Sequence, residues 1–152
     1  MLGVQIRWGY FYVLCVASLV ALYLGLTGDN RFGMITNEHD KLAHFVTFLL
    51  ESWLFTRSIE SSELDVESLL VVWRRWGGIY GRQYDEMEEE STVHHVSKYS
   101  VSIYVCIVLG AVGSECLQLI LSWGRRKFDV MDVVYNICGS LVGIGTAYWI
   151  ER

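Results

Sequence analysis

The stretch FDVMDVVYNICGSLVGIG, residues 128–145, places acidic side chains at the beginning of an apolar run and glycines further along it. In steps of three, four, three and four residues it carries Asp129, Asp132, Asn136, Gly139 and Gly143. On an α-helix this spacing forms a continuous stripe along one face. Two glycines four residues apart allow a neighbouring helix backbone to approach closely. The stretch therefore predicts a helix that packs through its glycines and presents its acids to the interior of a helical bundle.

Apolar runs elsewhere in the chain set the fold class. Of the 152 residues, 53% are hydrophobic and none is proline, and the mean hydropathy is +0.33. A helix of about 20 apolar residues crosses the ~30 Å hydrocarbon core of a bilayer. Four spans are predicted, at about residues 8–26, 42–56, 99–123 and 130–150, the second being short. The predicted fold is an all-α, polytopic membrane protein with a four-helix transmembrane bundle in one domain.

A long loop, residues 57–98, is predicted between the second and third spans. Leu69, Val72, Trp73 and Trp76 recur in it at helical spacing, which indicates a helix lying on the membrane surface or packed on the protein itself. The acidic run at residues 85–90 is typical of a solvated, disordered stretch.

Several functional classes have little support. The net charge of −5 provides no basic footprint for nucleic acid. The four cysteines lie inside apolar runs, where they are expected to be small hydrophobic residues rather than disulfides or metal ligands. The first span is longer than a signal-peptide core and is expected to be retained.

Polar residues are concentrated at three span ends. In an alternating topology the second span begins, the third ends and the fourth begins on the same side of the membrane, so these residues should share one leaflet. The candidate pocket residues are Asp40, Lys41, His44, Glu115, Gln118, Arg126, Asp129, Asp132 and Asn136. Ionisable groups inside a membrane are costly and by default indicate function. An ion-pair network that only holds the helix ends together is the structural alternative.

Three motifs in this polar set resemble the VanZ-like family of small integral membrane proteins. They are DKLAH (residues 40–44), ECLQ (residues 115–118) and RKFDVMDVVYNICGSLVG (residues 126–143). The resemblance implies the four-span fold and covers about two thirds of the chain. Residues 57–98 depart from the family, which usually joins these spans more briefly, and resemble a eukaryotic, fungal elaboration. The family is named after a protein associated with glycopeptide resistance, so the resemblance implies a fold and a motif rather than a reaction.

Two functions remain open at this point. The favoured one is a pocket that binds a polar or anionic lipid headgroup, or acts in lipid or envelope homeostasis, with no catalytic residue, cofactor or metal ion. The alternative is an intramembrane hydrolase or transferase, possibly metal-dependent, that would use His44, Glu115 and Asp132. The expected partners are membrane lipids; a homo-oligomer and a protein partner bound through residues 57–98 stay open. The expected location is a eukaryotic endomembrane such as the endoplasmic reticulum, in preference to a bacterial plasma membrane.

Overall fold

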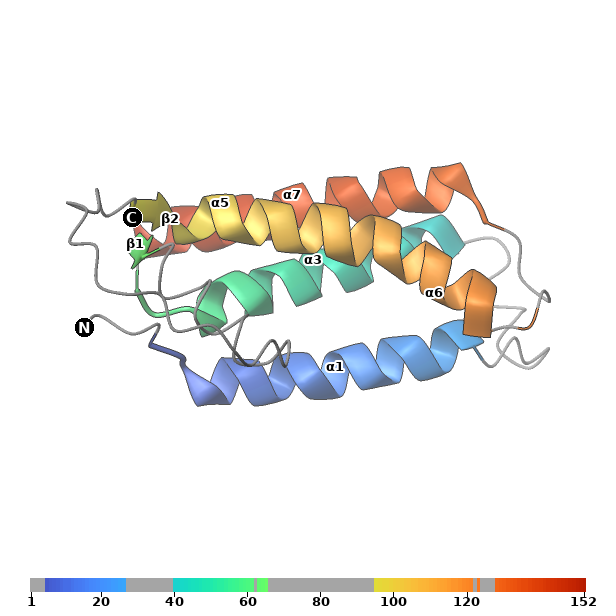
Figure 1. Ribbon diagram of the computed structural model, residues 1–152, viewed down its shortest axis with the longest axis horizontal. Coiled ribbons are helices and arrows are strands. Elements are labelled where there is room, and N and C mark those ends of the chain that lie inside the picture. The colour runs from blue at the N-terminus through green and yellow to red at the C-terminus, as the bar shows by residue number, and fades with distance from the viewer. Residues whose placement is uncertain (1–4, 27–39, 62, 66–94, 122, 124–127) are drawn as a thin grey trace, which may run out of the picture.

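The chain is mostly helical, as predicted. The computed structural model describes residues 5–26, 40–61, 63–65, 95–121, 123 and 128–152. Figure 1 shows the elements in chain order: α1 (Trp8–Leu26), α3 (Asp40–Ser58), β1 (Glu63–Asp65), β2 (His95–Ser97), α5 (Lys98–Ile103), the π-helix η1 (Tyr104–Val112), α6 (Gly113–Leu121) and α7 (Val130–Glu151). The helices begin and end within two residues of the four predicted spans.

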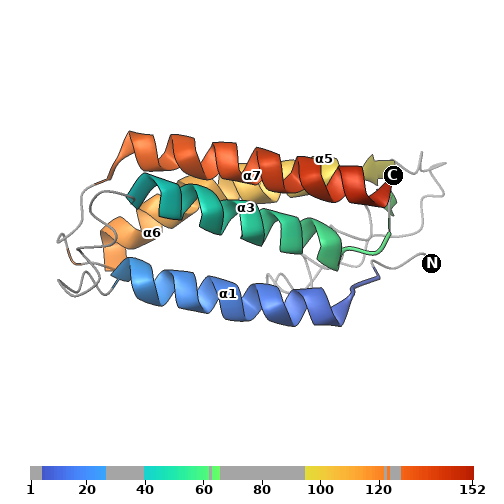
Figure 2. The ribbon, with the colours of Figure 1, turned by 180° about the vertical axis from the view of Figure 1, so that it is seen from behind.

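The helices lie side by side along the long axis of the molecule. At one end, called here the sheet end, lie β1, β2, the end of α3, the start of α5 and the end of α7 (Figure 1). At the opposite end α1 and α6 finish while α3 and α7 begin, as the view from behind also shows (Figure 2). The predicted grouping of the polar span ends is therefore possible.

The closest helix pair is α3 and α7, which run alongside each other over much of their length. A Cβ atom added to Gly139 would clash with the carbonyl oxygen of Phe45, and one added to Gly143 would clash with that of Leu49. A Cβ atom added to Gly145 would meet nothing within 4 Å. The glycine face predicted from the stripe is thus the face that contacts α3.

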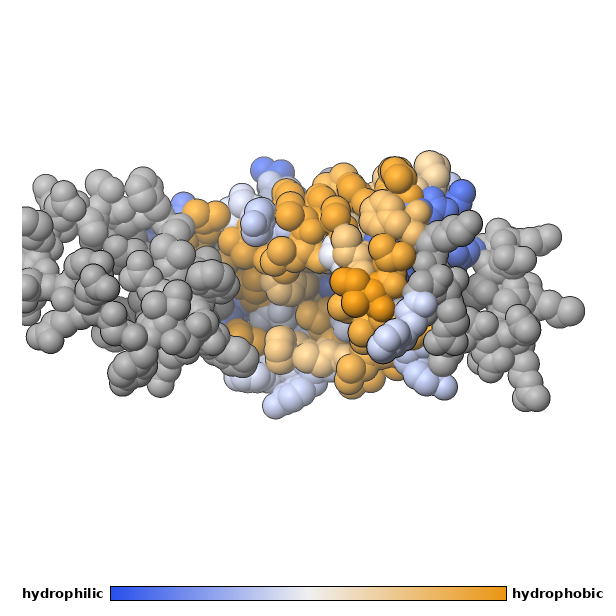
Figure 3. All heavy atoms as spheres, turned by 45° about the vertical axis from the view of Figure 1, so that its right-hand side comes forward, coloured by the Kyte–Doolittle hydropathy of each residue, from blue (hydrophilic) through white to orange (hydrophobic). Residues whose placement is uncertain are grey.

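The most deeply buried side chains among the described residues are mostly small or hydroxyl-bearing, although Leu64 and Ile144 are also buried. Exposure is 1% or less for Ser52, Thr56, Ser102, Ala111, Asn136, Ser140 and Ala147. Many larger apolar side chains are instead exposed. Helix α1, for example, has no buried residue. Figure 3 shows apolar side chains covering the middle of one face of the molecule.

Three helical segments are long and apolar enough to cross a membrane: Trp8–Leu26, Lys98–Leu121 and Val130–Glu151. Helix α3 is less apolar because it carries Asp40, Lys41, Glu51 and Arg57. It is also the helix that packs against both α1 and α7, so its polar residues have helix neighbours.

The third segment is continuous from Lys98 to Leu121 but changes helical type along its length. A nine-residue π-helix, Tyr104–Val112, separates the α-helices α5 and α6. Such wide turns are rare and occur frequently at functional sites. Hydrophobic periodicity gave no signal for this change.

The ends of the predicted loop are structured. Arg57 and Ser58 belong to α3, Lys98 begins α5, and β1 and β2 pair antiparallel with Leu64 opposite Val96. The hydroxyl oxygen of Ser97 caps α5 by accepting from the Tyr99 amide at 3.3 Å. The tryptophan-containing helix and the acidic run predicted for the loop lie outside the described residues.

Candidate functional site

Five of the predicted pocket residues meet at the end of the molecule opposite the sheet. We call this group the His44 cluster: Asp40 and His44 in α3, Glu115 in α6, and Asp132 and Asn136 in α7. Asp40 and His44 share a face because they are four residues apart on a helix. Asp132 and Asn136 share a face of α7 for the same reason, so two helices suffice to bring four of the side chains together.

The imidazole of His44 is the centre of the cluster. Its Nδ1 lies 3.1 Å from Asn136 Oδ1 and 3.9 Å from Glu115 Oε1. Its Nε2 lies 3.7 Å from Asp132 Oδ2 and 4.0 Å from Asp40 Oδ1. The 3.1 Å contact has hydrogen-bond length, whereas the contacts with carboxylates are longer than a hydrogen bond.

The Asn136 contact favours one tautomer of His44. A hydrogen on Nδ1 donates to the Asn136 carbonyl oxygen, which leaves a lone pair on Nε2. That lone pair is on the side of Asp40 and Asp132. The ligand atoms of Asp40, His44 and Asp132 all lie within 4.8 Å of one another, a spacing that could hold a metal ion.

The cluster is buried except at Asp40. The side chains of His44 and Asp132 are each 10% exposed and that of Glu115 is 4% exposed, whereas Asp40 is 42% exposed. Asn136 is fully buried, and among the described residues its amide nitrogen has no hydrogen-bond partner. A buried donor of this kind costs about 1–3 kcal/mol unless something accepts its hydrogen.

The remaining predicted pocket residues take other positions or lie outside the described residues. Lys41 is exposed on the first turn of α3. Asp129 caps α7, its Oδ1 accepting from the Met131 amide at 2.8 Å. Gln118 extends toward α1, where a Cβ atom on Gly25 would lie 3.1 Å from its Nε2. Arg126 lies outside the described residues.

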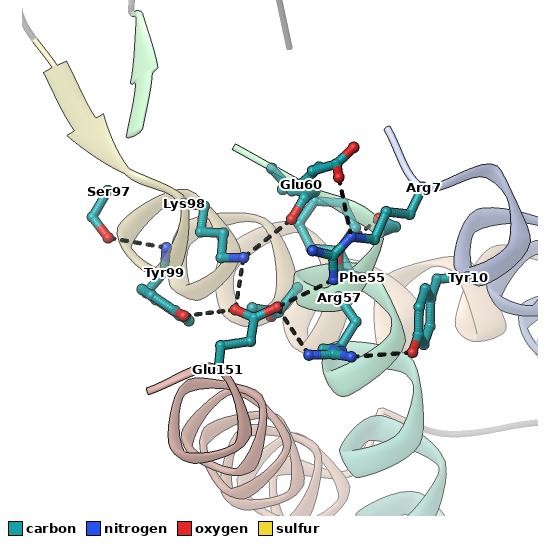
Figure 4. A network of polar contacts seen from close by, with 12 residues as sticks. Arg7, Tyr10, Phe55, Arg57, Glu60, Ser97, Lys98, Tyr99 and Glu151 are labelled. Carbon is teal, nitrogen blue, oxygen red and sulfur yellow. Dashed lines mark hydrogen bonds and ion pairs between the residues drawn. The ribbon is translucent and has the colours of Figure 1, made fainter. Parts of the chain in front are cut away.

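A second polar network, at the sheet end, was missed in the sequence (Figure 4). Its centre is Glu151, the last residue of α7, whose Oε2 lies 2.6 Å from Lys98 Nζ and accepts from the Tyr99 hydroxyl at 2.7 Å. Its Oε1 accepts from Arg57 at 3.2 Å and lies 3.8 Å from Arg7 Nη1. We call these five residues the Glu151 network. The span-order argument applied to the other end would have found it, because Glu151 ends the fourth span while Arg57 and Lys98 flank the loop.

Further contacts extend the Glu151 network to every helical segment. Arg57 Nη2 donates to the Tyr10 hydroxyl of α1 at 3.1 Å, and Lys98 Nζ donates to the Ile59 carbonyl at 3.1 Å (Figure 4). Both oxygens of the central carboxylate have partners. This network therefore has the character of a structural tie between helix ends.

Glu51 belongs to neither the His44 cluster nor the Glu151 network. It lines a cavity of about 320 Å³ between α1, α3 and η1, together with Ser18, Phe48 and Cys106. Glu51 thus lines a cavity between helices and is separate from the His44 cluster.

Comparison with known proteins identifies the family of the chain. A family model described as VanZ/LLP1 matches residues 10–151. The chain is similar to "Uncharacterized protein YJR112W-A" of Saccharomyces cerevisiae, with 31% identity over 134 residues that cover 88% of this chain and all of the yeast protein. No solved structure matches the chain significantly. The match spans all the helices, and the predicted resemblance is confirmed: the chain belongs to the VanZ/LLP1 family.

Proposed function

We propose that this protein is a multi-pass membrane protein whose His44 cluster binds a phosphate-bearing lipid headgroup at one leaflet. In this proposal α3 is the fourth membrane-crossing helix, although it is the least apolar. Its 19 residues extend about 28 Å at 1.5 Å per residue, close to the thickness of a hydrocarbon core.

The packing of the chain supports membrane insertion of α3. The most deeply buried side chains of α3 and α7 are mostly small or hydroxyl-bearing, while many large apolar side chains of the described residues face outward. This is the reverse of a water-soluble core and is typical of helices that associate within lipid. Helix α3 is enclosed by α1 and α7, so its polar residues need not face hydrocarbon.

The unpartnered amide nitrogen of Asn136 is the observation that carries the binding proposal. Arg57 Nε of the Glu151 network is also buried without a partner among the described residues, but the two polar groupings differ in how closely their members approach one another. The Glu151 network is held by contacts of 2.6, 2.7 and 3.2 Å, which suits a structural tie. His44 has a single contact of hydrogen-bond length, and the fully buried Asn136 keeps a donor for another acceptor. A headgroup oxygen that enters past the exposed Asp40 would supply that acceptor.

Catalysis by the same residues has less support. Among the described residues, the hydrogen bond and ion pairs of His44 go to one amide and three carboxylates, and none goes to a hydroxyl or thiol that could act as a nucleophile. A hydrolase or transferase would then have to use water. Headgroup binding needs no nucleophile.

For its surroundings we propose an endomembrane such as the endoplasmic reticulum. The similar yeast protein is eukaryotic, which supports this location over a bacterial plasma membrane. Residues 57–98 are proposed to reach a protein partner or the membrane surface at the sheet end, away from the His44 cluster.

Replacing Asn136 with leucine tests the binding proposal. Leucine has a similar size but offers no donor to a headgroup and no acceptor to His44. We expect Asn136→Leu to retain phosphatidic acid about tenfold more weakly than wild type, equivalent to about 1.4 kcal/mol. The measurement is native mass spectrometry of the detergent-solubilised protein titrated with phosphatidic acid.

Thr146→Val is the matched control for this experiment. Thr146 is exposed on the same helix, and its hydroxyl bonds only to the Val142 carbonyl of the preceding turn, at 2.7 Å. This variant should retain the lipid as wild type does. Equal retention by wild type, Asn136→Leu and Thr146→Val would refute headgroup binding at the His44 cluster.

A further inference from the structure

The charge of the His44 cluster raises a question about any phosphate bound there. The side chains that surround the imidazole include three carboxylates, those of Asp40, Glu115 and Asp132. Like charges close together in a medium of low dielectric repel strongly. A phosphate group would enter this site far more readily if a cation lay between it and the carboxylates.

We propose that Asp40, His44 and Asp132 bind a divalent metal ion, which in turn carries the phosphate of the headgroup. The second half of this inference rests on the proposed function, whereas the metal site stands on its own geometry. Each of the three residues offers one ligand atom, and these atoms lie within 4.8 Å of one another. Two of the ligands come from adjacent turns of α3 and the third from the first turn of α7.

The distances suit ligands around one ion. Two donor atoms that each bind a metal at about 2.1 Å with a tetrahedral angle are about 3.4 Å apart. His44 Nε2 lies 3.7 Å from Asp132 Oδ2 and 4.0 Å from Asp40 Oδ1. Small side-chain rotations would close this difference. The same distances are too long for direct hydrogen bonds between His44 and the two carboxylates.

Asn136 provides a second, independent observation. Its Oδ1 lies 3.1 Å from His44 Nδ1, so the imidazole is oriented with Nε2 toward the two carboxylates. A metal-binding histidine typically donates its other N–H to an oxygen in this way. The amide nitrogen of Asn136 is fully buried and has no partner in the described part of the chain. In this proposal it donates to an oxygen bound to the ion.

The ligand types narrow the choice of metal. Two carboxylates and one imidazole suit Zn²⁺ or Mn²⁺, whereas Ca²⁺ prefers six to eight oxygen ligands. Three protein ligands leave open positions for water or for phosphate oxygens. The exposed side chain of Asp40 gives these positions access from the end of the molecule.

Manganese binding tests the metal site directly. Full-length protein is purified in detergent, stripped with EDTA and titrated with Mn²⁺, and the free ion is measured by electron paramagnetic resonance. Wild type should bind one tight Mn²⁺ per chain. Asp132→Asn and Asp40→Asn should each weaken this binding at least about tenfold, because each removes a charged ligand.

Two features of the design keep the result interpretable. Asp40→Asn changes an exposed side chain, so its fold should survive even if that of Asp132→Asn does not. Glu63→Gln, an exposed carboxylate in β1 at the sheet end, removes the same charge and should bind Mn²⁺ as wild type does. The inference is overturned if wild type binds no stoichiometric Mn²⁺, or if both aspartate variants bind it like Glu63→Gln.

Lipid retention with and without the metal separates this inference from the proposed function. Phosphatidic acid retention that requires added Mn²⁺ would support both. Retention that is undiminished in EDTA would leave the headgroup site standing and refute the role of the ion as its carrier. One tight Mn²⁺ per chain without any phosphatidic acid retention would establish the metal site and refute the headgroup proposal.

Discussion

Substituting leucine for Gly139 is expected to separate α3 from α7 and to destabilise the protein strongly. A Cβ atom at this position would clash with the Phe45 carbonyl oxygen, which is part of a helix backbone and cannot rotate away. Overpacking of a rigid core commonly costs about 1–3 kcal/mol and sometimes more. We expect the upper end of that range and, at about 2–4 °C per kcal/mol for a chain of this size, a fall in unfolding temperature on the order of 10 °C.

Gly145→Leu is the control for this prediction. It makes the same chemical change six residues further along α7, where an added Cβ atom meets nothing within 4 Å. Thermal unfolding in detergent, followed by intrinsic tryptophan fluorescence, should show Gly145→Leu near wild type and Gly139→Leu well below it. Equal unfolding temperatures for the two variants would mean that close approach of α3 is not what Gly139 provides.

The α3–α7 contact was predictable because its signal is local and periodic. Asp132, Asn136, Gly139 and Gly143 follow the helical repeat, so their shared face could be deduced before their partner was known. The grouping around His44 was also accessible, since it depends only on the order and direction of the helices. These parts of the structure need no knowledge of side-chain conformation.

The positions of the other candidate site residues depend on side-chain conformations, which the spacing of residues in the sequence does not determine. Gln118 lies one helical turn from Glu115, yet its long side chain extends toward α1. Asp129 belongs to the same stripe as Asp132, but at a helix start its carboxylate is drawn to the Met131 amide at 2.8 Å. The π-helix in the third segment likewise arises from packing, because an apolar run has no periodic marker for a wider turn.

The Glu151 network was not predicted from the sequence, for a different reason. Arg57 and Lys98 lie at the ends of the predicted loop, residues 57–98, and none of the five network residues was a predicted site residue. In the structure Lys98 is only 3% exposed, and its ammonium group lies between a carboxylate and a backbone carbonyl. Charged residues at the ends of predicted spans should therefore first be considered as ion-pair partners for charged residues at span ends on the same side of the membrane. Only those without such a partner should be assigned to solvent.

Removing the charge of Glu151 is expected to have an effect as large as that of Gly139→Leu. Glu151→Gln keeps the size of the side chain but takes the negative charge away from Arg57 and Lys98, whose side chains are 17% and 4% exposed. Breaking a buried ion pair by removing one partner costs about 3–5 kcal/mol, because the other charge stays buried without compensation. We expect Glu151→Gln to unfold on the order of 10 °C below wild type in detergent, and Glu60→Gln to unfold near wild type, since the Glu60 side chain is 51% exposed and 3.9 Å from Arg7.

A double variant identifies the cause of that loss. Lys98→Met in the Glu151→Gln background removes the buried ammonium group that the first substitution leaves uncompensated, and methionine fills much of the same space. Replacing a buried ion pair by apolar residues of similar volume is often close to neutral, so the double variant should recover part of the unfolding temperature. Recovery would show that uncompensated charge caused most of the loss of stability in Glu151→Gln. The part not recovered would be assigned to the hydrogen bond from Tyr99 to Glu151. If Lys98→Met lowers the stability of Glu151→Gln still further, the network contributes through its packing and hydrogen bonds, and the charge argument for this end of the molecule is wrong.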